Sequence, residues 1–147
     1  MPKFSDLVNS FVKETEERMH AVFVSSVQKA VAVMQEPVGA GGNMPVDTGF
    51  LRNSIVAAHG TTPPAITLRK NPGDGVFAYD PQAINATILT ATLNEGVSVI
   101  YSAEYAIFAE FGSRGRPGRR FVMHAAQQWP QIVSRQSREL EHRVRNG

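Results

Sequence analysis

Four arginines in one seven-residue segment are the side chains best suited to making strong charged contacts. Arg114, Arg116, Arg119 and Arg120 lie in the sequence Arg-Gly-Arg-Pro-Gly-Arg-Arg, which contains no acidic residue. A guanidinium group can hold a carboxylate or a phosphate through two parallel hydrogen bonds. We therefore expect the segment from Arg114 to Arg120 to contact an acidic protein surface or a nucleic-acid backbone, the alternative being a solvated basic loop.

The sequence contains no motif that is typical of a catalytic or metal-binding site. There is no cysteine, and the histidines at positions 20, 59, 124 and 142 lack the spacing of a zinc site. No Gly-x-Ser-x-Gly elbow occurs, and the glycine clusters at 39–42 and 112–118 do not match a nucleotide-binding loop. The glutamates within 14–17 fit a solvated helix face. We expect no enzyme activity, no metal and no cofactor.

Length and composition predict one globular domain over residues 1–147. The chain is 42% hydrophobic and 19% charged, values that are ordinary for a soluble protein. Neither a secretory signal nor an apolar run of about 18 residues is present, so we expect no membrane contact. The net charge of +2 is uneven, because eight arginines against two glutamates leave +6 from Gly112 onward.

The first element that we expect is a long helix from Phe4 to Met34. Apolar residues recur there every three or four positions, and most charged residues fall between them. The pattern stops at Pro37, which precedes three closely spaced glycines. About thirty residues make a helix about 45 Å long, which exceeds the width of a domain of this size. We therefore expect part of the apolar stripe to face another subunit, the alternative being a kinked core helix.

Two further helices are expected in the C-terminal part of the chain. Residues Ala103 to Phe111 form a short one that stops at Gly112. Residues 121–145 place apolar side chains on one side and form a long one, bent at Pro130. The segment between these helices, Ser113 to Arg120, is predicted to be a loop.

Strands are expected in the middle of the chain. Residues 54–58 form one, while 84–93 and 97–101 alternate apolar and polar side chains around a turn and predict a hairpin. Residues 61–81 hold several prolines and glycines and predict an extended loop or arm. The expected fold is α+β, with the long N-terminal and C-terminal helices packed on a small antiparallel β-sheet.

Two blocks of sequence carry a family resemblance. The first is Pro-Val-Asp-Thr-Gly-Phe-Leu-Arg-Asn-Ser-Ile over 45–55, and the second is Tyr-Ala-Ile-Phe-Ala-Glu-Phe-Gly-Ser over 105–113, followed by Arg-Arg-Phe-Val over 119–122. In order and spacing they resemble the tail-completion, or head-tail joining, family of long-tailed double-stranded-DNA bacteriophages. The stretch 61–81 is longer than a compact member would have, so its contacts cannot be transferred from the family.

The resemblance implies a structural virion protein of the phage neck. Such a subunit completes the proximal end of the tail and joins tail to head as a homo-oligomeric ring, with a hexamer favoured by the symmetry of the tail tube. Its partners would be other neck proteins, namely the connector or adaptor, the tail terminator and the tail tube, and it would assemble in the host cytoplasm. The arginines would face acidic rims of those proteins or make nonspecific contact with transiting DNA, and the sequence does not choose between them.

The residues of the two blocks have expected structural roles. Asp47 is predicted to cap the turn that follows it, and Gly49 to permit a close approach or an unusual φ. Leu51 and Ile55 are predicted to anchor the turn in the core. The full set assigned to assembly or structure is Asp47, Thr48, Gly49, Leu51, Arg52, Glu110, Phe111 and Gly112, beside the basic contact loop of Arg114, Arg116, Arg119 and Arg120.

Two hypotheses accompany these roles. Arg52 and Glu110 carry opposite charges in the two blocks, and we expect an ion pair between them within or between subunits. The alternative function is that of a basic nucleic-acid-binding protein that uses Arg114 to Arg120 and the arginines of the last helix. No aromatic residues are interleaved with those arginines, and Tyr101, Tyr105, Phe108 and Phe111 are assigned to core packing instead.

Overall fold

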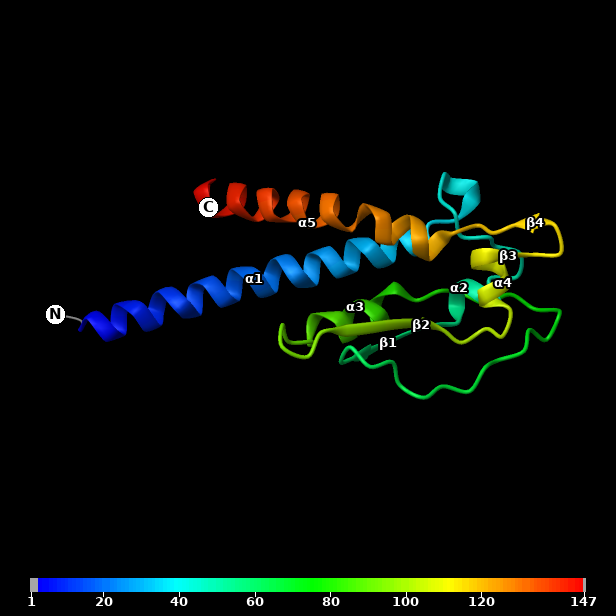
Figure 1. Cartoon of the computed structure of the whole chain (residues 1–147), viewed down its shortest axis with the longest axis horizontal. Helices are drawn as coiled ribbons and strands as arrows, with labels where there is room; N and C mark the ends of the chain where they lie inside the picture. Colours follow the sequence, from blue (N-terminus) through cyan, green and yellow to red (C-terminus); the bar gives the residue numbers. More distant parts are fainter. Residues whose placement is uncertain (1–2, 147) are drawn as a thin grey trace.

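The computed structural model describes residues 3–146 and confirms the predicted α+β fold, in which two long helices pack against each other (Figure 1). α1 covers Phe4–Gln35 and α5 covers Phe121–Asn146, and the two run in opposite directions. Between them the chain forms a 3-10 turn, three short helices and four strands. These are η1 Val38–Ala40, α2 Phe50–Asn53, β1 Ile55–His59, α3 Pro81–Leu89, β2 Val97–Tyr101, α4 Ala106–Phe111, β3 Gly112–Ser113 and β4 Arg116–Pro117.

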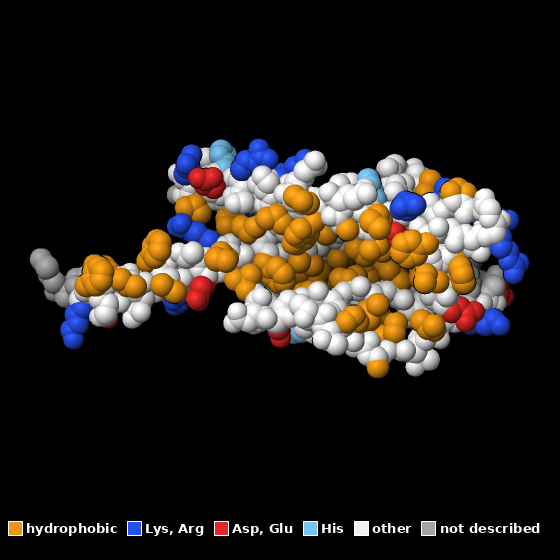
Figure 2. Space-filling model, viewed as in Figure 1, with side chains coloured by type: hydrophobic (Ala, Val, Ile, Leu, Met, Phe, Trp, Pro, Cys, Tyr) orange, Lys and Arg blue, Asp and Glu red, His pale blue; other side chains and the backbone are white. Residues whose placement is uncertain are grey.

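α1 is an unbroken helix of 32 residues, and its two halves have different surroundings. The second half buries Val24, Val31 and Met34 against the rest of the molecule. The first half projects beyond the body, and Phe4 and Phe11 are 81% and 69% exposed (Figure 2). The helix is therefore not a core helix along its whole length, and no residue among 3–146 covers the apolar side chains of its first half.

The central sheet has two antiparallel strands, β1 and β2, in a register that places Ile55 opposite Tyr101 and His59 opposite Val97. Ile55 packs with Val24 and Val31 of α1 and with Ile88 of α3, and these four residues form one buried cluster. The sheet therefore sits against the second half of α1, as expected, with α3 beside it (Figure 1).

The predicted hairpin over 84–93 and 97–101 is wrong, because residues 81–89 form the helix α3. Asp80 caps this helix, accepting a hydrogen bond from the backbone N–H of Gln82 at 2.9 Å, and Pro81 occupies the first turn, where its missing N–H costs nothing. Ile84 and Ile88 then lie one turn apart and face the same cluster. With this segment helical, β2 pairs with β1 instead.

The long segment between β1 and α3 contains no helix or strand, as predicted, but it is attached to the body and is not a free arm. The backbone of Arg69 bonds to Ser102 and Glu104, and its guanidinium carbon lies 5.0 Å from the centre of the Phe50 ring. Further along, the Phe77 ring meets Phe50 edge to face at 5.2 Å. These contacts add to a second buried cluster, formed by Met44, Phe50, Leu51, Ala103 and Phe121.

α5 begins at the buried Phe121 and continues through Pro130 to Asn146. Proline cannot donate the backbone hydrogen bond that the fourth residue before it would accept. The helix nevertheless continues on both sides of Pro130, supported by its long contact with α1. In the described part of the chain, no helix is long and apolar enough to cross a membrane.

Candidate assembly interface

Gly49 is required by the backbone at the start of the first block. Its φ is +88°, in the left-handed region that side chains disfavour, and a Cβ added there would lie 2.3 Å from the carbonyl oxygen of Phe77. The neighbouring Thr48 carbonyl accepts a hydrogen bond from the Phe77 N–H at 2.9 Å, which fixes this close approach. The prediction for Gly49 is confirmed, and so is the burial of Leu51 and Ile55.

Asp47 does not cap the following helix, and that prediction is wrong. α2 begins after Gly49, and its first N–H, that of Phe50, points to the side-chain oxygen of Thr48 at 3.3 Å. Because the backbone of Gly49 is left-handed, the chain turns so that Thr48, which is one residue nearer to α2 than Asp47, makes this contact. Asp47 is left exposed at the surface, where its carboxylate is free to meet a partner.

The predicted ion pair between Arg52 and Glu110 does not form within the subunit. Arg52 donates from Nε to the Gln35 carbonyl at 2.9 Å, and its guanidinium carbon lies 5.0 Å from the centre of the Tyr79 ring. Gln35 in turn donates from its side chain to the Arg52 carbonyl at 2.8 Å. Arg52 therefore joins the end of α1 to α2 and to the long segment.

Glu110 instead holds the N-terminus of α5. Its two carboxylate oxygens accept hydrogen bonds from the backbone N–H groups of Val122 and Met123, at 2.8 and 2.9 Å. These are unpaired donors of the first helical turn, where the helix dipole also favours a negative charge. Glu110 is 6% exposed, and both of its oxygens accept these bonds, so its role within the subunit is to hold α5.

The arginine segment is a hairpin, whereas we expected an irregular loop. β3 and β4 pair Gly112 with Pro117 and Ser113 with Arg116, leaving Arg114 and Gly115 as a two-residue turn. Both turn residues have positive φ, +48° and +78°, as in a type I′ turn. We call residues 112–120 the arginine hairpin.

The arginine hairpin packs closely on the end of α4. A Cβ on Gly118 would lie 2.1 Å from the Glu110 carbonyl oxygen, so only glycine allows this contact. The Arg119 and Arg120 N–H groups donate to the carbonyls of Ala109 and Glu110, at 2.8 and 3.1 Å. Gly112 has a φ of +94° and ends the helix, as predicted.

All four arginines of the hairpin are exposed, and within residues 3–146 none of them forms an ion pair. They lie at the opposite end of the molecule from the N-terminus of α1 (Figure 1). Basic side chains gather at that end of the surface in Figure 2. Acidic side chains in the described part of the subunit therefore do not neutralise the charge of the hairpin.

Beside the arginine hairpin lies an apolar surface that the sequence reasoning missed. Phe108 and Phe111 are 58% and 62% exposed, and Ile107 is equally open. The assignment of Phe108 and Phe111 to the core is wrong, while Tyr101 and Tyr105 do pack against the second buried cluster. We call Ile107, Phe108 and Phe111 the α4 patch. The mixed spacing of apolar residues along this short helix could have indicated that both of its faces carry large apolar side chains.

The two sequence blocks meet around a cavity of about 510 Å³. Asp47, Thr48 and Gly49 line it from the first block, Tyr105 and Ala109 from the second, and Arg119 from the hairpin. Burial raises the pKa of the Tyr105 phenol, so this hydroxyl is protonated at neutral pH. The cavity thus gathers a carboxylate, a guanidinium and hydroxyl groups, which suit polar contacts with a partner segment.

Comparison with models of protein families, with curated proteins and with solved structures found no match to this chain. The family resemblance therefore rests on the two sequence blocks alone. Among residues 3–146 no three histidine, aspartate or glutamate side chains are grouped so that they could hold a metal ion.

Proposed function

We propose that this protein is a structural subunit of the neck of a long-tailed bacteriophage. In this role it completes the proximal end of the tail and joins the tail to the head as a member of a ring in the virion, for which a hexamer is favoured. The observation that carries the proposal is the arginine hairpin beside the α4 patch. Exposed apolar side chains next to unneutralised guanidinium groups form a surface suited to a protein partner with an acidic rim.

The geometry of the two blocks supports an architectural role. Five residues of the two blocks help to hold α2, α4 and α5 in fixed positions, namely Gly49, Leu51, Arg52, Glu110 and Gly112. Their combined effect is to present the hairpin and the α4 patch on a rigid base. A rigid base lowers the entropic cost of ordering the interface when a partner binds. This suits a subunit that keeps its shape while DNA passes.

The alternative, a nucleic-acid-binding protein, has weaker support from the arrangement of the arginines. Arg135, Arg138 and Arg143 are exposed along α5, but the first of them lies fourteen residues from the helix start, about 20 Å along the axis. Arg145 is paired with Glu141 at 3.1 Å. The hairpin and the α5 arginines therefore form two separate basic regions, and neither carries a row of exposed aromatic side chains between its arginines.

Imaging of particles assembled with and without this protein tests the proposal. We expect particles without it to show unjoined heads and tails, and the paired change Arg114→Glu with Arg116→Glu to reproduce that defect. The matched control, Arg135→Glu with Arg138→Glu, makes the same charge change elsewhere and should join normally. If tails of normal length join heads without the protein, the proposal fails. Tight duplex DNA binding by a protein that particles do not need would favour the alternative.

A further inference from the structure

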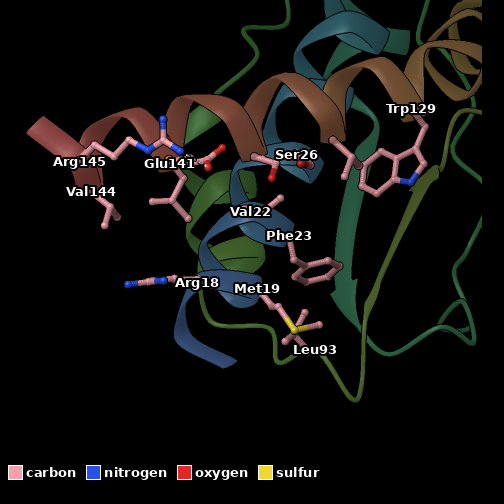
Figure 3. Close-up of a pocket in the computed structure, with 13 residues that line it drawn as sticks. Arg18, Met19, Val22, Phe23, Ser26, Leu93, Trp129, Glu141, Val144 and Arg145 are labelled. Carbon is pink, nitrogen blue, oxygen red and sulfur yellow. Dashed lines mark hydrogen bonds and ion pairs between the residues drawn. The ribbon is translucent and has the colours of Figure 1, made fainter. Parts of the chain in front are cut away.

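An open groove runs between α1 and α5 on the face shown in Figure 2, with a volume of about 830 Å³. Met19, Val22 and Phe23 line it from α1, and Trp129, Val133 and Leu140 from α5. Figure 3 shows these α1 side chains and Trp129 around the same hollow. The groove is mostly apolar, and no side chain in the described part of the chain fills it.

The projecting half of α1 carries an apolar stripe on the same side of the helix as the groove. At about 100° per residue, Phe11, Thr15, Met19 and Val22 fall on one side. Figure 2 shows apolar side chains along the projecting helix that lead toward the hollow. Stripe and groove are thus two parts of one continuous surface, and the stripe is its exposed end. We define the α1 stripe as Phe4, Leu7, Val8 and Phe11.

The positions of stripe and groove residues along α1 are mirror images about Thr15. The stripe residues lie eleven, eight, seven and four positions before Thr15, and four of the five α1 residues that line the groove lie four, seven, eight and eleven positions after it. These four are Met19, Val22, Phe23 and Ser26; the fifth, Arg18, lies three positions after Thr15, and its mirror position holds the exposed Val12. Two copies of the helix placed antiparallel, with their Thr15 residues together, therefore bring each stripe onto the groove of the other copy.

We propose that two copies of this chain pair in this way, about a two-fold axis at Thr15. Phe11 of each copy then lies over Met19 of the other, and Val8 over Val22. Because the contact is the same from both sides, one geometry covers both stripes and both grooves at once.

The charges along the two helices support a second copy as the occupant. Residues 3–17 of α1 hold two lysines and four acids, a balance of −2. Residues 134–146 of α5, beside the groove, hold four arginines and two acids, a balance of +2. On α1 itself Glu14 and Arg18 lie one turn apart on the same flank. Antiparallel pairing brings Glu14 of each copy near Arg18 of the other copy.

The pairing goes beyond the proposed function and does not depend on it. A ring with rotational symmetry has no two-fold axis between neighbours, so the pair is the form of the free protein and must open before such a ring closes. The particle assay described above tests the neck role, whereas the mass of the purified protein tests the pair, so the two can fail separately.

Sedimentation equilibrium of the full chain over a range of concentrations gives that mass. We expect a reversible approach to twice the chain mass of 16.1 kDa. Phe11→Glu places a charge at the contact and should raise the dissociation constant at least about tenfold. The matched control is Val76→Glu, a 92% exposed apolar residue of the long segment, which should leave the constant unchanged. A monomer at every concentration, or equal effects of both variants, would overturn the proposal.

Cross-linking tests the two-fold axis, since the natural chain has no cysteine. Thr15→Cys puts the two introduced thiols face to face, so a disulfide-linked dimer should form on mild oxidation. Glu17→Cys lies about 200° around the helix and serves as the control that should not link. If Thr15→Cys does not link although the protein has the mass of a dimer, the two-fold arrangement is wrong. Both sites are exposed, so folding is not at risk.

Discussion

The carboxylate of Glu110 accepts a hydrogen bond from the backbone N–H of Val122 at 2.8 Å, across the eleven residues that separate them. Those residues include the whole arginine hairpin, so this contact closes the base of the hairpin. It also joins the last turn of α4 to the first turn of α5. This buried carboxylate therefore adds to the backbone contacts of Arg119 and Arg120 in fixing the position of the hairpin.

Replacing Glu110 should destabilise the fold. Glu110→Ala leaves two part-buried helix N–H groups without their acceptor, and we expect the free energy of unfolding to fall by about 2–3 kcal/mol. Glu110→Gln keeps one acceptor but loses the charge, and about 1 kcal/mol should be lost. Urea unfolding measures both. Glu104→Ala, at an exposed position just before α4, is the control and should change stability by less than about 0.5 kcal/mol; a similar loss there would contradict the capping role.

The double charge reversal Arg52→Glu with Glu110→Arg should not rescue stability. The two residues contact different groups, so the losses of the single variants should add to within about 0.5 kcal/mol. Urea unfolding of the wild type, both singles and the double completes the cycle. A double variant that is more stable than either single would contradict this independence and support a direct interaction between the two residues.

Gly49→Ala should be strongly destabilising. The new Cβ meets the Phe77 carbonyl oxygen at 2.3 Å and the residue must keep a φ of +88°, so we expect a loss of about 2–4 kcal/mol. Gly39→Ala is the matched control, since nothing lies within 4 Å of its Cβ and its φ is not positive. Thermal unfolding should show a large drop in Tm for the first variant and almost none for the second.

Stability should fall as the pH rises above about 10. Burial, reinforced by the nearby Tyr79 and Glu110, raises the pKa of the Tyr101 phenol above its ordinary value of 10.0. The unfolded chain therefore releases this proton first, and the stabilisation is lost as alkali favours the unfolded state. Tyr101→Phe also loses the hydrogen bond to Gln35, and its free energy of unfolding should lie furthest below that of the wild type near neutral pH. Urea unfolding between pH 8 and about 11 should show this difference in free energy becoming smaller; a constant difference would contradict the prediction.

The α4 patch should tolerate polar substitution in the free protein. Phe108→Ser removes an exposed ring, so the free energy of unfolding should change by less than about 0.5 kcal/mol. Under the proposed function the same variant should impair joining of heads to tails in the particle assay. Phe50→Ser, in the buried cluster, should instead unfold the protein. Normal joining with Phe108→Ser would remove the patch from the proposed interface.

The helices at both ends of the chain could be predicted because each carries a long apolar period, which local sequence alone determines. Residues 84–89 were misassigned because apolar alternation over a few residues fits a strand as well as a helix. The residues that decide in favour of a helix lie just before this stretch, where Asp80 is the N-cap and Pro81 is in the first turn. A sequence window that includes these two residues predicts a helix here.

The roles of Arg52 and Glu110 could not be predicted from their charges. The partner of Glu110 is a set of backbone N–H groups, which every residue has and no sequence pattern marks. Arg52 likewise binds a carbonyl and an aromatic ring. Contacts between a side chain and distant backbone depend on the tertiary arrangement, and opposite charge is a poor guide to them.

The projecting half of α1 has one more consequence. A helical segment of about fifteen residues without tertiary contacts is only marginally stable in water, and none of the residues that the structure describes covers the α1 stripe. Its helix–coil equilibrium is therefore linked to association, so ordering and pairing of the stripe occur together. Helical content measured by circular dichroism should then rise with protein concentration, and the heat capacity of association should be more negative than rigid docking would give.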